Sequence, residues 1–137
     1  MSWDIFVQDI PPGVESVDQM PDDFRPGTIG TRDAIIAGIL RVVPDADFSD
    51  PSWGTIDGAT YSIEVNIGGG GSVTSFALHV RGGDNAAYVV HDILTELGLR
   101  AFDPSSPSGI FALDTGSLDG LRRWRAYRDE RLRGGST

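Results

Sequence analysis

The 137-residue chain contains neither cysteine nor lysine. Without cysteine there is no disulfide framework, no thiolate zinc site and no cysteine nucleophile. Without lysine there is no Schiff-base chemistry, and all eleven cationic residues are arginine. No run of about 18 apolar residues occurs, and the opening segment lacks a basic stretch followed by an apolar one. We therefore expect a soluble, cytoplasmic protein.

The charge is acidic and unevenly distributed. The formal net charge is −9, with 17 acidic residues and 5 arginines before Leu118 but 6 arginines and 3 acidic residues from Leu118 onward. An acidic body disfavours nucleic acid and anionic membranes and favours a basic protein as partner, although solubility alone would also explain it. The length predicts a single domain, residues 1–137, that buries roughly two thirds of its unfolded surface.

The chain is organised around residues 61–80, where two alternating segments flank four glycines. In both segments β-branched and aromatic residues alternate with polar ones, which is typical of half-buried strands. Glycine adopts positive φ without steric cost, so the pattern predicts an antiparallel hairpin with one apolar and one polar face.

Apolar residues also recur at helical spacing in two segments. Thr31 can cap the first helix and Pro44 ends it, whereas Asp84 can cap the second and Gly98 supplies its stop. The polar side of the second helix is expected to carry His91, Asp92, Thr95 and Glu96.

A basic helix is predicted over residues 118–133, followed by a frayed tail at 134–137. Its arginines alternate with Trp124 and Tyr127. We expect this helix to dock on the acidic body of the protein, with a protein contact or nucleic acid as alternatives.

Further strands are expected at residues 3–10, 99–102 and 110–113. The resulting order predicts an α+β fold: a two-layer sandwich whose antiparallel sheet carries helices on one face, ferredoxin-like (βαββαβ) with an added C-terminal helix. Another α+β sandwich, with the terminal strands in a hairpin, is the alternative.

Two irregular stretches separate these elements. Residues 11–30 contain four prolines and are expected to form an ordered loop or a lid. In residues 44–58, Asp45, Asp47 and Ser49 resemble the start of a calcium loop, but Asp50 stands where such a loop needs glycine. Acidic turns without metal are therefore expected here, with Phe48 and Trp53 covering the sheet edge or forming an exposed contact site.

The segments SWDIFVQDIP, DFSDPSWG, YSIEVNIG and SFALHVRGG extend over most of the chain up to about Arg100. Together they resemble a family of small bacterial proteins to which no function is assigned. The resemblance implies a single domain but assigns no activity, ligand or residue role.

The polar face of the predicted sheet is the candidate functional surface. Asp4, Gln8, His79 and Arg81 are expected to lie close together, with Glu64 one strand away. A histidine beside a carboxylate can act in acid/base catalysis. The alternative is a solvated sheet face on which the same residues form ordinary cross-strand ion pairs.

We therefore expect a non-enzymatic, acidic protein-binding module without cofactor or metal. Its size and charge resemble those of immunity proteins, which neutralise bacterial toxins. The alternatives are a small-ligand-binding or hydrolytic domain around His79, and a homo-oligomer using the sheet face or the last helix. The candidate binding residues are Asp4, Gln8, Asp45, Asp47, Asp50, Trp53, Glu64, His79 and Arg81.

Overall fold

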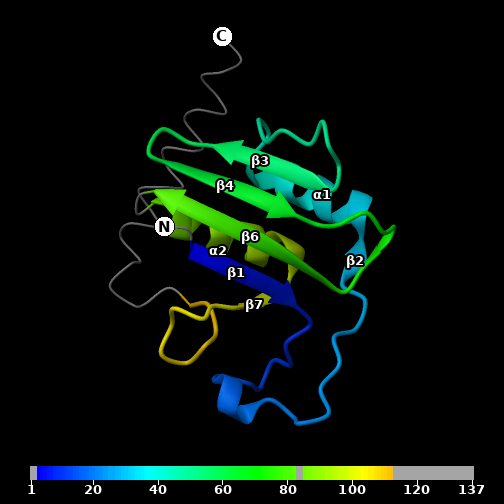
Figure 1. Ribbon diagram of the computed structural model, residues 1–137, viewed down its shortest axis with the longest axis vertical. Coiled ribbons are helices and arrows are strands. Elements are labelled where there is room, and N and C mark those ends of the chain that lie inside the picture. Colours follow the sequence, from blue (N-terminus) through cyan, green and yellow to red (C-terminus); the bar gives the residue numbers. More distant parts are fainter. Residues whose placement is uncertain (1–2, 83–84, 113–137) are drawn as a thin grey trace.

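The computed structural model describes residues 3–82 and 85–112 and is an α+β fold. A five-stranded sheet has the order β3-β4-β6-β1-β7, and each pair of neighbouring strands is antiparallel (Figure 1). Its strands are β1 (Trp3–Gln8), β3 (Trp53–Asp57), β4 (Tyr61–Asn66), β6 (Ser75–Gly82) and β7 (Arg100–Phe102). A separate two-stranded sheet pairs β2 (Gly30–Thr31) with β5 (Ser72–Val73).

The central pair, β4 and β6, confirms the predicted hairpin faces. Ile63 is opposite Val80 and Val65 is opposite Leu78, and these side chains are buried. Side chains alternate across a strand, so this register turns the polar residues between them to the other side of the sheet. A strand register shifted by one residue would turn all of these apolar side chains toward solvent.

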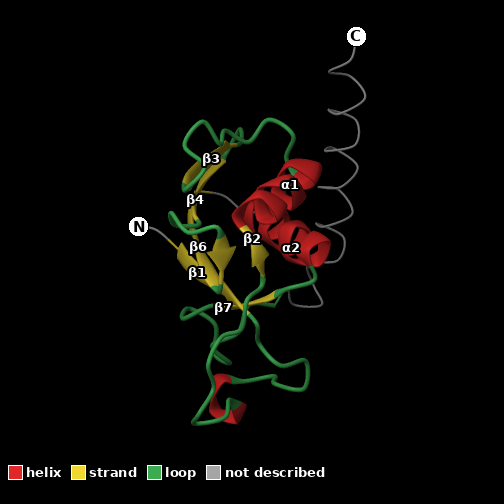
Figure 2. Cartoon of the chain, turned by 90° about the vertical axis from the view of Figure 1, so that its right-hand side faces the viewer, coloured by secondary structure: helices red, strands yellow, loops and turns green. Residues whose placement is uncertain are grey.

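Both predicted helices are present as α1 (Arg32–Val42) and α2 (Asn85–Leu97). The Thr31 hydroxyl caps α1 by accepting the Ala34 amide hydrogen at 3.1 Å, and α2 stops at Gly98, where φ is 65°. The helices lie together on one face of the sheet (Figure 2). No described element covers the opposite, polar face.

The α1–α2 contact is close because Gly38 faces Leu97. A Cβ atom at Gly38 would lie 2.4 Å from Leu97 Cδ2, and Arg41 Nε pairs with Glu96 Oε1 at 2.5 Å beside this contact. Between helices and sheet, the fully buried side chains include Ile5, Ile35, Ile39, Ile63, Leu78, Val89 and Ile93. This apolar layer is the core that joins the helices to the sheet.

Strand β3 was not predicted, because residues 44–58 were expected to be irregular throughout. Only Gly54 and Ile56 of this strand face the core, so the sequence carries too few apolar residues to show alternation. The strand forms because its whole length pairs with β4, with Ile56 opposite Ile63.

The glycine-rich connection also differs from a simple hairpin tip. The chain leaves β4, makes a bend with φ of 87° at Gly68 and forms β5 before it enters β6. Strand β5 pairs with β2, and the Ile29 amide donates to the Val73 carbonyl at 2.8 Å. The connection is therefore tied to the residues that precede α1.

Residues 11–30 pack beyond the β7 edge of the sheet (Figure 1). They contain a short 3₁₀ helix, Val17–Gln19, and Val14 joins a second apolar cluster with Ile10 and Ile110. The Arg100 guanidinium donates to the carbonyls of Pro11 and Val14. This segment does not cover the polar face, which places it away from the position expected of a lid over His79.

Smaller differences lie near the end of the described chain. Asp92 is buried instead of facing water, and Ile110 forms one isolated bridge with Phe102 instead of a strand. The predicted cap at Asp84, the basic helix over 118–133 and the tail at 134–137 lie outside the described residues. Within the described part, neither α-helix has the length and apolar character needed to cross a membrane.

Candidate functional site

The polar face of the sheet is arranged in rows that cross the strands. The strand register places Thr55, Glu64, His79 and Asp4 side by side in a charged row. The neighbouring aromatic row consists of Trp53, Asn66, Ala77, Phe6 and Phe102. Directly opposite residues in antiparallel strands lie within about 5.5 Å, so members of a row are in contact range.

Asp4 and His79 form the closest contact in the charged row. His79 Nδ1 lies 2.8 Å from Asp4 Oδ1, and the two side chains are 25% and 42% exposed. Because a carboxylate only accepts hydrogen bonds, Nδ1 carries the proton of this contact, and Nε2 is the acceptor of the neutral ring. Asp4 thus orients the imidazole and selects its tautomer.

Trp53 reaches across β4 to the same histidine. The ring centroids of Trp53 and His79 are 5.9 Å apart and their planes meet at 23°, an offset stack. Trp53 is nevertheless 41% exposed. The indole and the imidazole together form an aromatic surface beside the charged row.

Glu64 lies on β4, directly opposite Thr55 and His79, and forms an ion pair with Arg81. The distance from Arg81 Nη1 to Glu64 Oε1 is 3.6 Å, which is longer than a hydrogen bond, and the two side chains are 59% and 34% exposed. Exposed pairs of this kind contribute at most about 1 kcal/mol. The Glu64 carboxylate therefore remains open to a second cation.

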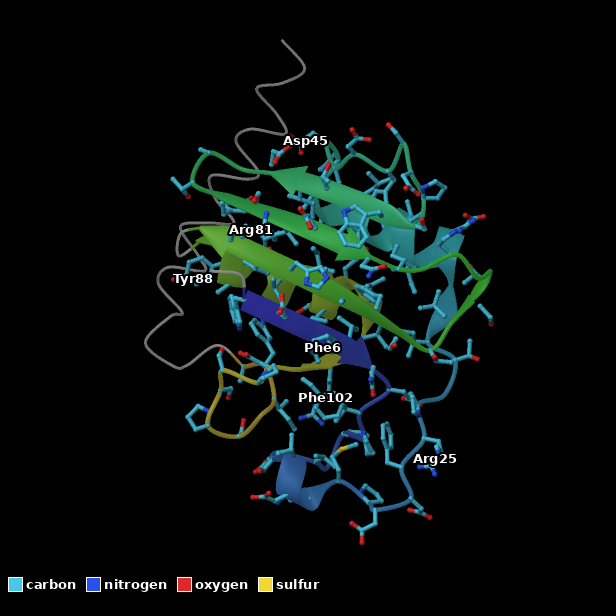
Figure 3. All side chains as sticks on the ribbon, viewed as in Figure 1. Phe6, Arg25, Asp45, Arg81, Tyr88 and Phe102 are labelled. Carbon is cyan, nitrogen blue, oxygen red and sulfur yellow. The ribbon has the colours of Figure 1, made fainter. Side chains whose placement is uncertain are left out.

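The other end of the face has a different character. Phe6 is 38% exposed and is opposite Phe102 on β7; Figure 3 shows these two rings at the lower part of the sheet. Gln8 is opposite Ser75 and Arg100, four residues along β1 from Asp4. Gln8 therefore does not join the His79 group, contrary to the prediction from the sequence.

The acidic loop, residues 45–52, borders this face at β3. Asp47 Oδ1 accepts the Ser49 hydroxyl at 2.6 Å and the Ser49 amide at 2.8 Å, and Asp50 Oδ1 accepts the equivalent groups of Ser52 at 2.7 and 3.0 Å. These hydrogen bonds, the hydroxyl ones foremost, hold the pKa of both Asp47 and Asp50 below the ordinary aspartate value. Both carboxylates are therefore charged near neutral pH.

The acidic loop is fastened to the outer edge of β3. Asp47 and Thr55 exchange two backbone hydrogen bonds of 2.8 and 2.9 Å, and the Trp53 amide donates to the Asp50 carbonyl at 3.1 Å. At the opposite edge, Phe111 donates its amide to the Ala101 carbonyl of β7 at 3.0 Å. Because backbone groups at both edges are already paired, the open face offers a larger free surface than either edge.

The sequence anticipated some of this arrangement and missed the rest. Asp4 and His79 were expected to lie close together, with Glu64 one strand away, and the Asp4–His79 contact is present. The ion pair between Glu64 and Arg81 was not predicted. The aromatic row was not recognised. Phe6, between Ile5 and Val7, was a usable signal, since an aromatic residue at a polar-face position is exposed by the alternation itself.

Among the residues that the structure describes, no group of three histidine, aspartate or glutamate side chains is placed to hold a metal ion. No protein-family model, curated protein or solved structure matches the chain. The function is therefore argued from the site.

Proposed function

We propose that the protein is a non-enzymatic, acidic protein-binding module that uses its open sheet face and the acidic loop. The observation that carries the proposal is the exposed indole of Trp53, which stacks on His79 and directly follows the acidic loop that contains Asp47 and Asp50. An exposed tryptophan keeps apolar surface in contact with water, which is unfavourable unless a partner covers it.

The composition of this face supports a protein partner. Protein interfaces are enriched in tryptophan and phenylalanine at their centre and polar at their rim, and a few such residues contribute most of the binding free energy. Trp53 and Phe6 are large apolar residues that remain exposed. Around them, the Asp4–His79 hydrogen bond and the Glu64–Arg81 ion pair provide a polar rim.

The charge of the chain supports a basic partner. The net charge is −9, and the acidic loop is hydrogen-bonded to β3 through the backbones of Asp47 and Thr55 and of Asp50 and Trp53. Complementary charge speeds encounter and excludes partners of like charge. A protein that neutralises a bacterial toxin by covering a basic surface, as immunity proteins do, is the specific form of this proposal.

We propose further that the fold is ferredoxin-like, a two-layer sandwich with β3 as an added edge strand. This is supported by the adjacency of β7, β1, β6 and β4, and by the positions of α1 after β1 and α2 after β6. In such an arrangement one face of the sheet carries no helix and is available to a partner.

A small-ligand-binding or hydrolytic domain is the second candidate. It is favoured by the Asp4–His79 hydrogen bond of 2.8 Å, since a carboxylate on Nδ1 orients a histidine as a general base. Hydrolysis also requires a nucleophile or an activated water at Nε2. Turnover that disappears in His79→Ala would favour this candidate over the binding module.

Affinity capture from the source cell tests the leading proposal. The intact chain is compared with Trp53→Ala, with the triple variant Asp45→Lys, Asp47→Lys, Asp50→Lys, and with Val17→Ala. Val17 is 43% exposed in the 3₁₀ helix and serves as the matched control for removal of a surface apolar side chain.

A basic protein retained by the intact chain and by Val17→Ala, but lost from Trp53→Ala, is the expected result. An interface anchor contributes about 2 kcal/mol or more, which lowers affinity roughly 30-fold. Identical captured proteins for all variants would exclude this face as the binding surface.

A further inference from the structure

We infer that the patch formed by Trp53, Glu64 and His79 recognises an arginine side chain of the partner protein. This inference rests on the proposed function and deepens it by naming the group that is bound. The three residues come from the adjacent strands β3, β4 and β6.

Trp53 supplies the flat surface that a guanidinium group prefers. Guanidinium is planar and weakly hydrated, and it stacks on aromatic faces more readily than the ammonium group of lysine. The stack on His79 holds the indole in one orientation while 41% of Trp53 remains exposed. Binding of an arginine therefore costs less conformational entropy of Trp53 than it would if the indole rotated freely.

Glu64 supplies the charge. It is directly opposite His79, and Trp53 reaches past it from the neighbouring strand. Arg81 shows that a guanidinium group can approach this carboxylate, but it remains 3.6 Å away and 59% exposed. An incoming arginine can hydrogen-bond at a shorter distance, and Arg81 competes with it.

His79 supplies an acceptor. Its Nδ1 is occupied by Asp4, while Nε2 has no hydrogen-bond partner within the described part of the chain. A guanidinium group carries five N–H donors and no acceptor, so a carboxylate and a neutral imidazole nitrogen match its needs. A site with two hydrogen-bond acceptors beside an aromatic face thus favours an arginine over an apolar side chain of the partner.

Two other kinds of molecule are alternatives to a basic protein as the occupant of this face. A second copy of the chain could cover the aromatic row, and open sheets that carry aromatic residues can also stack RNA bases. The net charge of −9 opposes both, because like-charged chains and phosphates are repelled.

The experiment uses two fluorescein-labelled peptides, one with three arginines and one with three lysines, each alternating with glycine. Binding to the full chain is measured by fluorescence anisotropy at low salt. The variants are Trp53→Leu, which keeps an apolar side chain but removes the aromatic face, Glu64→Gln, which keeps side-chain shape, and the triple variant Asp45→Asn, Asp47→Asn, Asp50→Asn. Circular dichroism confirms that each variant is folded.

The arginine peptide should bind about threefold more tightly than the lysine peptide, as one exposed cation–π contact predicts. Trp53→Leu and Glu64→Gln should each remove this preference, whereas the triple loop variant should weaken both peptides equally. Equal affinities for the two peptides, or an unchanged preference in Trp53→Leu and Glu64→Gln, would overturn the inference.

A matched pair of arginine variants tests the competition by Arg81. Arg81→Gln should strengthen binding of the arginine peptide more than Arg25→Gln does. Arg25 is exposed in the 11–30 segment, far below the sheet in Figure 3, so its replacement changes the net charge equally without freeing Glu64. Equal effects of the two variants would exclude Glu64 as the arginine's acceptor.

Sedimentation velocity and a labelled oligouridylate complete the test. A dimer that Trp53→Leu dissociates would assign the face to a second copy, and tighter binding of RNA than of peptide would assign it to nucleic acid. A captured partner that depends on Trp53 without an arginine preference would overturn only this inference. An arginine preference without any captured partner would overturn only the proposed function.

Discussion

The aromatic ring of Phe48 lies directly against the backbone of Gly54. A Cβ atom at Gly54 would be 2.3 Å from Phe48 Cε1, so the ring occupies the place of a side chain. This contact joins the acidic loop to β3 from the core side, while the Asp47–Thr55 backbone pair joins them along the edge. The position of the acidic carboxylates relative to Trp53 depends on it.

Gly54→Ala should therefore destabilise the protein by about 1–3 kcal/mol, the usual range for overpacking. In a Phe48→Ala background the same change should have little effect, because the obstructing ring is gone; a double-mutant cycle by urea denaturation measures this coupling. Gly69→Ala is the control, since a Cβ there meets no atom within 4 Å. Additive effects of the two substitutions would contradict the contact.

Asp103 should stabilise the chain by joining distant segments. Its Oδ1 accepts the Trp3 indole N–H at 2.8 Å and the Ser105 hydroxyl at 2.6 Å, and the residue is only 5% exposed. Asp103→Ala leaves these donors without an acceptor and should cost about 1–3 kcal/mol. Asp103→Asn, which retains an oxygen, should cost less. Asp22→Ala, at an exposed position, is the control in the same denaturation assay.

The acidic loop should titrate in a residue-specific way. The Ser49 hydrogen bonds lower the pKa of Asp47, and those of Ser52 lower the pKa of Asp50. Ser49→Ala should raise the pKa of Asp47 toward the ordinary value and leave Asp50 unchanged, and Ser52→Ala should do the converse. Carbon-detected NMR of the side-chain carboxyls measures both.

The sign of the accompanying stability change follows from the lowered pKa values. Because both carboxyls bind protons less readily in the folded state, their stabilisation is present above the ordinary aspartate pKa and is lost as the pH falls through the folded pKa. The serine variants should therefore differ from the intact chain near neutral pH and converge with it in acid. A difference that grows in acid would contradict the hydrogen-bond assignment.

The cap of α1 should contribute to stability. Thr31 accepts the Ala34 amide hydrogen, so Thr31→Ala should cost about 1 kcal/mol, measured by thermal or chemical unfolding. Thr28→Ala, at another exposed threonine just before the helix, is the control. Equal losses for the two variants would show that the hydroxyl of Thr31 does not act as a cap.

Much of the secondary structure could be predicted because its signals are local. The alternation around Ile63 and Leu78 predicted two strands with one buried face, and Gly98 predicted the end of α2. In each case neighbouring residues repeat with the period of the element, or one residue type suits a special φ. The Asp4–His79 contact was anticipated from the same alternation together with an assumed order of strands.

Strand β3 and the aromatic row depended on contacts between distant parts of the chain. The Trp53 ring meets His79 only because β3 pairs with β4 at one particular register, and residues 53–57 carry almost no apolar pattern of their own. Local sequence determines which side chains can share a face, because side-chain direction alternates along each strand. The order and register of the strands determine which of them meet, and those are set by the burial of the whole sheet against α1 and α2.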